Sequence, residues 1–370
     1  MIKVGILSMQ RIANYGSFLQ AYGLKHMLED LGCEVQFVDY HPGETLIPSN
    51  EGTGIKRKIF KICETLKYSA PLKEKIRFIK YKKNYSKNYF PYLGIGDKMN
   101  FCPEVDLLVI GSDEVFNCVQ NNTNVGFAPE LFGEKNNAKR LISYAASFGN
   151  TTIDKIRKYK IDSKIEKWLK NFNAISVRDK NSGNIVQTLI RKEPEYNLDP
   201  VLAYDFMGKC KKIPKDIKEK NYIILYGYAG RFSKSECSKI KKYANNKNLE
   251  IFCIGGVQDA CDRFIDCDPF HVIAFFQHAD YVITDTFHGS ILSIITHRKF
   301  VSVVRNTGYG NSEKITDLLE RLHLKDRIID DIDKLDIMLD KEIDYKSIDA
   351  IIETEREKSY GYLKTQIKEV

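Results

Sequence analysis

Short apolar runs alternate with longer amphipathic stretches along the first half of the chain. The apolar runs cover residues 3–8, 35–40, 105–112, 141–147 and 174–178. A helical pattern over residues 17–31, closed by Gly32, separates the first two of them. The run at 105–112 is nearly continuous in Leu and Val, as is typical of a parallel strand buried on both faces. The first half therefore predicts a βαβ opening and a parallel sheet.

The alternation begins again after a lysine-rich stretch at residues 208–220, which predicts an interdomain linker. Predicted strands cover residues 221–229, 249–255, 281–285 and 300–304, and predicted helices cover residues 234–246, 269–279, 290–297 and 312–323. We expect an α/β protein of two doubly wound, Rossmann-like domains facing a cleft. The domains are predicted at residues 1–207 and 221–330. Residues 331–370 form a tail whose apolar spacing predicts a closing helix.

Composition fits a chain of this organisation, because 370 residues exceed what one core usually supports. The longest apolar runs are of strand length, so we expect no membrane span. Strand-like residues follow the first methionine directly, without a signal-peptide pattern, which predicts a cytoplasmic protein. The nine cysteines never form a C-x-x-C pair, and we expect reduced thiols and no metal site.

The net charge of +8 is concentrated in one segment. Residues 55–90 hold twelve Lys or Arg against two Glu, which argues against a general nucleic-acid coat. This segment is predicted as a helical insertion whose apolar face packs on the first domain; that face comprises Ile55, Ile59, Ile62, Leu66, Leu72, Ile76 and Ile79. Its lysines are either a solvated face or a surface for anionic lipid or a lipid-linked diphosphate sugar at the inner face of the membrane.

Polar residues follow several predicted strands, where ligands of open α/β sheets gather. Asn14, Tyr15, Gly16 and Ser17 lie where the first strand turns into a helix, whose free amides can bind an anion. Helix capping by Asn14 or Ser17 explains the same residues equally well.

Ser112 and Asp113 follow the buried run at 105–112. An ionised Asp113 can orient a sugar hydroxyl or accept its proton, whereas a turn or cap is the structural alternative. Ser147 ends the run at 141–147 and is either a ligand contact or part of ordinary strand packing.

Arg178 ends another predicted strand, and its guanidinium can hold phosphate or carboxylate with paired donors. An ion pair with neighbouring Asp179 is the alternative. His288 lies between a predicted strand and a predicted helix, together with Gly289 and Ser290. Its imidazole can act as an acid or bind an anion, against the alternative of a structural histidine.

Six short motifs carry a family resemblance. They are N-Y-G-x-x-L-Q-A-Y from Asn14, G-S-D-x-V-F-N from Gly111, I-S-Y-A-A-S-F-G from Ile142, S-V-R-D from Ser176, L-D-P-V-L from Leu198 and T-F-H-G-S from Thr286. In this order and spacing, over about the first 325 residues, the chain resembles the polysaccharide pyruvyl transferases. We interpret Asp199 and Pro200, within the fifth motif, as a structural turn outside the site.

The resemblance implies a glycosyltransferase-B-like fold and transfer of the pyruvyl group from phosphoenolpyruvate to sugar hydroxyls as a ketal. The products implied are capsule, exopolysaccharide or cell-wall glycans. Phosphoenolpyruvate is then a co-substrate and no cofactor is expected. The expected donor-binding residues are Arg178, His288, Gly289, Ser290 and Ser147, with His288 and Arg178 catalytic. The expected acceptor-binding residues are Asn14, Tyr15, Gly16, Ser17, Ser112 and Asp113.

Two other function classes stay open. A nucleotide-sugar glycosyltransferase could use the same two-domain fold, because the helix after Gly289 can hold a diphosphate. A carbohydrate-binding protein without catalysis would have no need for a guanidinium and an acid in one cleft. Wide separation of Arg178 and His288 would favour this last class.

Overall fold

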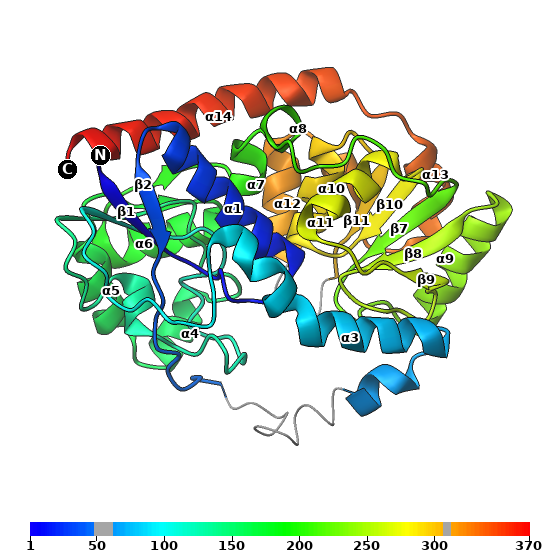
Figure 1. The fold of residues 1–370 in the computed structure, drawn as a ribbon, viewed down its shortest axis with the longest axis horizontal. Helices are drawn as coiled ribbons and strands as arrows, with labels where there is room; N and C mark the ends of the chain where they lie inside the picture. Colours follow the sequence, from blue (N-terminus) through cyan, green and yellow to red (C-terminus); the bar gives the residue numbers. More distant parts are fainter. Residues whose placement is uncertain (48–61, 306–311) are drawn as a thin grey trace.

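The computed structural model describes residues 1–47, 62–305 and 312–370, and contains two parallel sheets side by side (Figure 1). The first sheet has the order β2-β1-β3-β4, with bounds β1 Lys3–Leu7, β2 Glu34–Phe37, β3 Leu107–Ile110 and β4 Arg140–Ser143. Single bridges join this sheet to β5 (Ser176–Val177), which pairs with β6 (Glu195–Tyr196). β3 is buried at every position, as the apolar run predicts.

The second sheet has six parallel strands in the order β12-β11-β10-β7-β8-β9. Their bounds are β7 Tyr222–Tyr226, β8 Glu250–Ile254, β9 Arg263–Phe264, β10 Tyr281–Thr284, β11 Phe300–Val303 and β12 Ile328–Ile329. The order reverses between β7 and β10, which makes that edge a topological switch point of the Rossmann type. The predicted fold class, two Rossmann-like units in a glycosyltransferase-B-like arrangement, is confirmed.

Helices cover the faces of both sheets. Around the first sheet lie α1 (Tyr15–Asp30), α4 (Ile153–Lys158), α5 (Asp162–Lys170), α6 (Lys180–Ile190), α7 (Pro200–Ala203) and α8 (Phe206–Lys209). Around the second lie α9 (Lys234–Asn246), α10 (Pro269–His278), α11 (Phe287–Ile295), α12 (Ser312–Arg321) and α13 (Leu335–Asp340). α11 begins three residues earlier than the sequence pattern indicates, because Thr286 caps it by accepting from the Gly289 amide. His288 therefore lies in the first helical turn.

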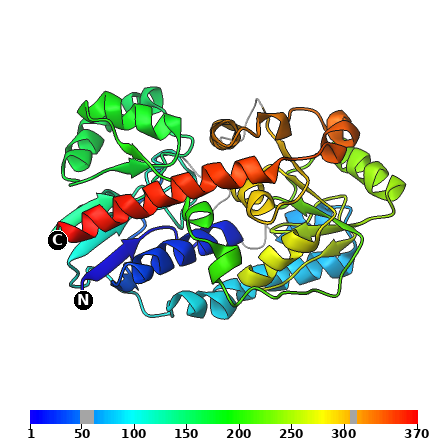
Figure 2. The same ribbon diagram turned by 90° about the horizontal axis from the view of Figure 1, so that it is seen from above.

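The C-terminal helix α14 (Tyr345–Lys368) returns from the second half to the first (Figure 2). Tyr362 donates its hydroxyl to the Ser143 carbonyl at 2.8 Å, and the Ser359 hydroxyl accepts from the Leu198 amide at 3.1 Å. Leu363, which follows Tyr362 in α14, is fully buried. The two chain ends consequently lie close together (Figure 1).

Helix α3 (Leu72–Tyr89) also links the two halves, although it belongs to the first by sequence. It packs on β9 through Phe78, whose ring centroid lies 5.2 Å from that of Phe264, and through Tyr81 at 5.4 Å. Its buried face consists of Glu74, Phe78, Tyr81, Tyr85 and Tyr89.

The prediction that aliphatic residues form the packing face of this segment was wrong. Leu72 and Ile76 are 60% and 44% exposed, and Ile62 and Leu66 are also exposed. Ile79 is half-buried, and Ile55 and Ile59 lie outside the described residues. The aromatic residues bury more area per side chain, and this decides which face turns inward.

No helix within the described ranges combines the length and apolarity needed to cross a membrane.

We expect Leu363→Ala to lower the free energy of unfolding by about 2–5 kcal/mol, because it leaves a cavity where α14 packs on the first half. Urea unfolding followed by circular dichroism measures the change. Lys364→Ala, one residue further along on the exposed face, is the matched control and should change the free energy by less than about 0.5 kcal/mol. Equal effects in the two variants would contradict the docking of α14.

Candidate functional site

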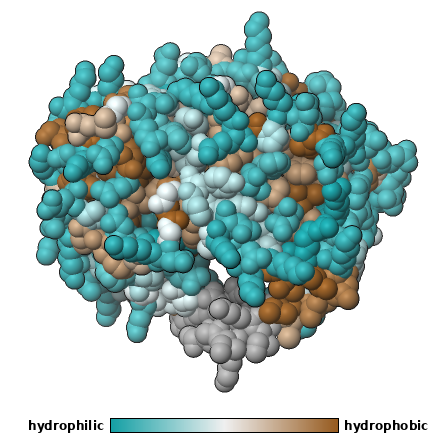
Figure 3. All heavy atoms as spheres, viewed as in Figure 1, coloured by the Kyte–Doolittle hydropathy of each residue, from teal (hydrophilic) through white to brown (hydrophobic). Residues whose placement is uncertain are grey.

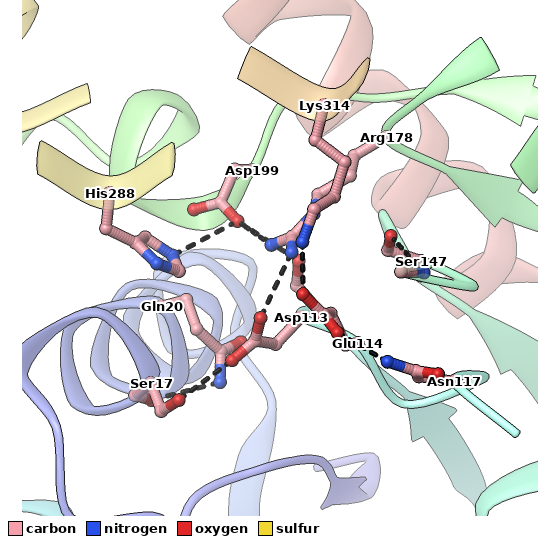
Figure 4. Close-up of polar contacts among 12 residues, drawn as sticks. Ser17, Gln20, Asp113, Glu114, Asn117, Ser147, Arg178, Asp199, His288 and Lys314 are labelled. Atoms are coloured by element: carbon pink, nitrogen blue, oxygen red, sulfur yellow. Dashed lines mark hydrogen bonds and ion pairs between the residues drawn. The ribbon is translucent and has the colours of Figure 1, made fainter. Parts of the chain in front are cut away.

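Polar side chains from both halves of the chain meet where the carboxyl ends of the strands face each other (Figure 4). Ser17 comes from the first turn of α1, Asp113 follows β3 and Arg178 follows β5. His288 comes from the first turn of α11, in the second half. Asp199 lies between them, immediately before α7.

The Arg178 guanidinium is at the centre of this cluster. Its Nη1 donates to Asp199 Oδ2 at 2.5 Å and its Nη2 donates to Asp113 Oδ1 at 3.0 Å. The side chain is only 2% exposed, and its Cζ lies 4.5 Å from the ring centroid of Phe287 in the second half. Arg178 is therefore held by two carboxylates and one aromatic face.

His288 approaches the same carboxylate from the opposite side. Its Nε2 lies 3.6 Å from Asp199 Oδ2, the oxygen that also binds Arg178. Arg178 and His288 are thus brought together, which argues against the carbohydrate-binding alternative. Arg178 Nε and His288 Nε2 are both buried without a hydrogen-bond partner among the described residues.

Gly16 makes room for the imidazole. A Cβ placed on Gly16 would lie 2.2 Å from His288 Nδ1, well inside van der Waals contact. The first turn of α1 and the first turn of α11 can therefore approach this closely only with glycine at position 16.

The charges of the cluster stabilise one another. Burial raises the pKa of Asp199, but the neighbouring His288 and Arg178 outweigh it and hold the pKa well below the ordinary range. The pKa of Asp113 is likewise lowered, because Arg178, His288 and the Ser17 hydroxyl outweigh desolvation. Burial lowers the pKa of Arg178, and Asp199 and Asp113 reverse this and raise it. Both carboxylates are therefore ionised at neutral pH.

Three further predicted residues contact this cluster. Ser17 Oγ donates to Asp113 Oδ2 at 2.8 Å, and Ser112 Oγ donates to the Ala145 carbonyl at 2.9 Å while lying 3.4 Å from Asp199 Oδ2. Asn14 caps α1 by accepting from the Ser17 amide at 2.7 Å. Of the two alternatives for this turn, capping by Asn14 is confirmed, and acceptor binding by Asn14 and Ser17 stays a prediction.

The other predicted residues have different surroundings. Tyr15 is buried and donates its hydroxyl to the Cys267 carbonyl at 2.8 Å, linking α1 to the second half. Ser147 Oγ donates to Asp179 Oδ2 at 2.6 Å, and Asp179 in turn caps α6. Ser290 hydrogen-bonds within the second half, to the Thr286 carbonyl and Ser302, and Gly289 packs against Thr284. Donor binding by Ser147, Gly289 and Ser290 stays a prediction.

Asp199 corrects the sequence interpretation. It caps α7, as the turn prediction implies, by accepting from the Val201 amide through Oδ1 at 3.0 Å. Its other oxygen, however, binds Arg178 and faces His288. The placement of Asp199 outside the site was therefore wrong, and its presence in the L-D-P-V-L motif was the available signal.

The sequence pattern did not predict a role for Glu114 or Lys314. They form an ion pair between the loop after β3 and the first turns of α12, and Lys314 is 4% exposed. The Lys314 ammonium lowers the pKa of Glu114 against the opposing effect of burial. No sequence pattern marks the pair, because the partners lie 200 residues apart.

We expect Gly16→Ala to displace the His288 ring and to lower the free energy of unfolding by about 1–3 kcal/mol through overpacking. A crystal structure and urea unfolding of the variant test this. Gly361→Ala, at a helical position of α14 with open space around it, should instead stabilise the protein by about 0.5–1 kcal/mol. A Gly16→Ala variant with an unmoved imidazole would contradict the close approach.

We expect Asp199→Asn to lower the free energy of unfolding at neutral pH by roughly 3 kcal/mol, because it leaves Arg178 with less compensating charge in a buried place. The pKa of Asp199 in the folded protein is depressed below the ordinary aspartate pKa of about 4. Its ionised form therefore adds to the free energy of unfolding above about pH 4, and this stabilisation is lost as the pH falls towards the folded-state pKa.

The difference in the free energy of unfolding between wild type and Asp199→Asn should therefore become smaller in acid. Urea unfolding at neutral pH and below about pH 4 measures this difference. Asp349→Asn removes a carboxylate from an exposed pair with His297 and serves as the control, with little change at either pH. A pH-independent difference for Asp199→Asn would show that its charge is not what matters.

Comparison with one solved structure supports the fold. Trehalose 6-phosphate synthase from Burkholderia multivorans aligns over 100% of this chain and 99% of its own, with 9% identity and a TM-score of 0.50. UDP-GlcNAc 2-epimerase from Methanocaldococcus jannaschii aligns over 96% of this chain and 99% of its own, with 11% identity and a TM-score of 0.47. No curated protein matches the chain in sequence.

Comparison with family models identifies the relationship more closely. The model described as polysaccharide pyruvyl transferase matches residues 14–307, from the cap of α1 to just beyond β11. Arg178, its partners Asp113, Asp199 and Phe287, and His288 all lie within this span, whereas Lys314 lies beyond it. The chain belongs to the polysaccharide pyruvyl transferase family, a family of transferases.

Proposed function

We propose that this protein transfers the pyruvyl group of phosphoenolpyruvate to two hydroxyls of a saccharide, forming a ketal. The convergence of Arg178 and His288 on one oxygen of Asp199 carries this proposal. Phosphoenolpyruvate has a carboxylate and a phosphate, and both groups accept hydrogen bonds from a guanidinium. The buried Nε of Arg178 has no hydrogen-bond partner among the described residues and is such a donor. Both residues come from segments matched by the family model.

His288 is proposed as the general acid. Protonation of the methylene carbon of the donor produces an oxocarbenium-like centre, which one sugar hydroxyl attacks while losing its proton. His288 Nε2 lies 3.6 Å from Asp199 Oδ2 and is buried without a hydrogen-bond partner among the described residues, and in the proposed reaction the imidazole supplies the first proton. The second hydroxyl then attacks the same carbon and closes the ketal ring, while the bond from that carbon to the phosphate oxygen breaks and the proton of the hydroxyl leaves with the phosphate.

Asp113 is proposed to orient the acceptor. Its carboxylate is ionised, accepts from Ser17 and lies across Arg178 from Asp199. In this position it can accept a hydrogen bond, or the proton, from the attacking sugar hydroxyl. Arg178 would neutralise the donor, and the closed packing of the two halves would align donor and acceptor. We propose a capsule, exopolysaccharide or cell-wall glycan as the destination of the product.

The test is phosphate release from phosphoenolpyruvate by the purified protein with a panel of lipid-linked and nucleotide-linked saccharides. We expect release only with a suitable acceptor, and a fall of about 10²–10⁴-fold in His288→Ala, as for loss of a general acid. Arg178→Lys retains the charge but cannot keep the fork between Asp113 and Asp199, so it should also lose most activity.

His297→Ala is the matched control, because His297 is an exposed histidine paired with Asp349 outside the site. It should turn over like the wild type. Absence of release with every acceptor, combined with turnover of a nucleotide sugar, would replace this proposal with the nucleotide-sugar glycosyltransferase alternative.

A further inference from the structure

Four large aliphatic side chains are exposed in the first turns of α3 and on the segment that leads into it. Ile62 and Leu66 are 41% and 44% exposed, and Leu72 and Ile76 are 60% and 44% exposed. Each pair is spaced by one helical turn. Lys75 Nζ donates to the Leu66 and Tyr68 carbonyls at 3.0 and 2.9 Å, which holds the two pairs together. An apolar surface is visible at the lower right of the molecule (Figure 3), where α3 begins (Figure 1).

The outward face of α3 changes from apolar to basic along its length. Leu72 and Ile76 are followed on the same side of the helix by Lys80, Lys83 and Lys87, at intervals of three or four residues. These lysines are exposed, and no acidic side chain in the described part of the chain pairs with them. The opposite side is the aromatic face that packs on β9.

This combination favours a lipid surface over a protein partner. A single exposed leucine is ordinary, whereas a contiguous aliphatic group beside a row of lysines is typical of helices that lie in a membrane interface. Protein interfaces concentrate their energy in Trp, Tyr and Arg. In α3 the aromatic residues Tyr81, Tyr85 and Tyr89 turn inward, and Arg77 pairs with Glu74. The positive charge calls for anionic lipid.

The position of α3 relates this surface to the site. Lys82 Nζ donates to the Ala13 carbonyl at 2.8 Å. Ala13 precedes Asn14, which caps the helix that carries Ser17 into the site. The middle of α3 therefore lies against the loop that enters the cluster around Arg178.

We propose that the outward face of α3, with Ile62 and Leu66, docks this protein on an anionic bilayer surface. The aliphatic side chains insert at the headgroup level and the three lysines contact anionic headgroups. A saccharide carried on a membrane lipid would then reach the site from the same side. This last step, the lipid-linked acceptor, rests on the proposed function, whereas docking itself does not.

The experiment is flotation of the full-length protein with vesicles of phosphatidylcholine alone or mixed with phosphatidylglycerol. We expect binding only to the mixed vesicles, weakening with added salt. Lys80→Gln, Lys83→Gln and Lys87→Gln together should lower the partition coefficient on the order of a hundredfold. Leu72→Ser with Ile76→Ser should also abolish flotation.

Matched controls lie elsewhere on the surface. Ile337→Ser removes an aliphatic side chain that is 75% exposed on α13, and Lys346→Gln, Lys364→Gln and Lys368→Gln remove exposed lysines from α14. Both controls should float like the wild type. Circular dichroism checks that every variant is folded. The proposal would be overturned if the controls and the α3 variants floated equally, or if the wild type did not float with mixed vesicles. Binding of an acidic protein to α3 in place of lipid would also overturn it.

A second readout separates docking from chemistry. With an acceptor saccharide offered both in solution and on vesicles, the α3 variants should retain phosphate release with the soluble form and lose it with the vesicle-borne form. Flotation without any phosphate release would leave docking intact and reject the proposed function. Loss of release with both forms would contradict a role confined to docking.

Discussion

The buried Arg178 guanidinium is the group around which the two halves of this protein are arranged. A guanidinium that is 2% exposed needs compensating charge, because the cost of removing it from water otherwise exceeds the gain from packing. Asp113 and Asp199 provide that charge from separate segments, and Phe287 of the second half covers the guanidinium. These contacts require the ends of both sheets to face each other at short distance.

The electrostatics of the cluster bear on how an anionic donor would bind. Two ionised carboxylates already accompany one guanidinium, so a donor with several negative charges has to share Arg178 with them. His288 Nε2 lies 3.6 Å from the Asp199 oxygen that binds Arg178, so the proposed general acid stands beside the carboxylate that compensates the guanidinium.

The second half contributes to the site mainly through side chains in the first turns of its helices, which contact residues of the first half. His288 is in the first turn of α11, and Lys314 in α12 pairs with Glu114 beyond β3. Tyr15 and α3 add contacts between α1 and the region of β9. The geometry of the site and the packing between the halves are therefore set by the same residues, which couples stability to the arrangement of the site.

The sequence by itself determined the alternation of strands and helices, the two Rossmann-like units and most of the polar residues at strand ends. These follow from local periodicity and from the short motifs around Asn14, Asp113, Arg178 and His288. The tertiary structure decided that Asp199 lies between Arg178 and His288, and that Ser147 donates a hydrogen bond to Asp179. It also decided that α3 buries its tyrosines and exposes Leu72 and Ile76. Pairings across tens or hundreds of residues, and the choice between two apolar faces of one helix, depend on which surfaces meet, and no local pattern encodes that.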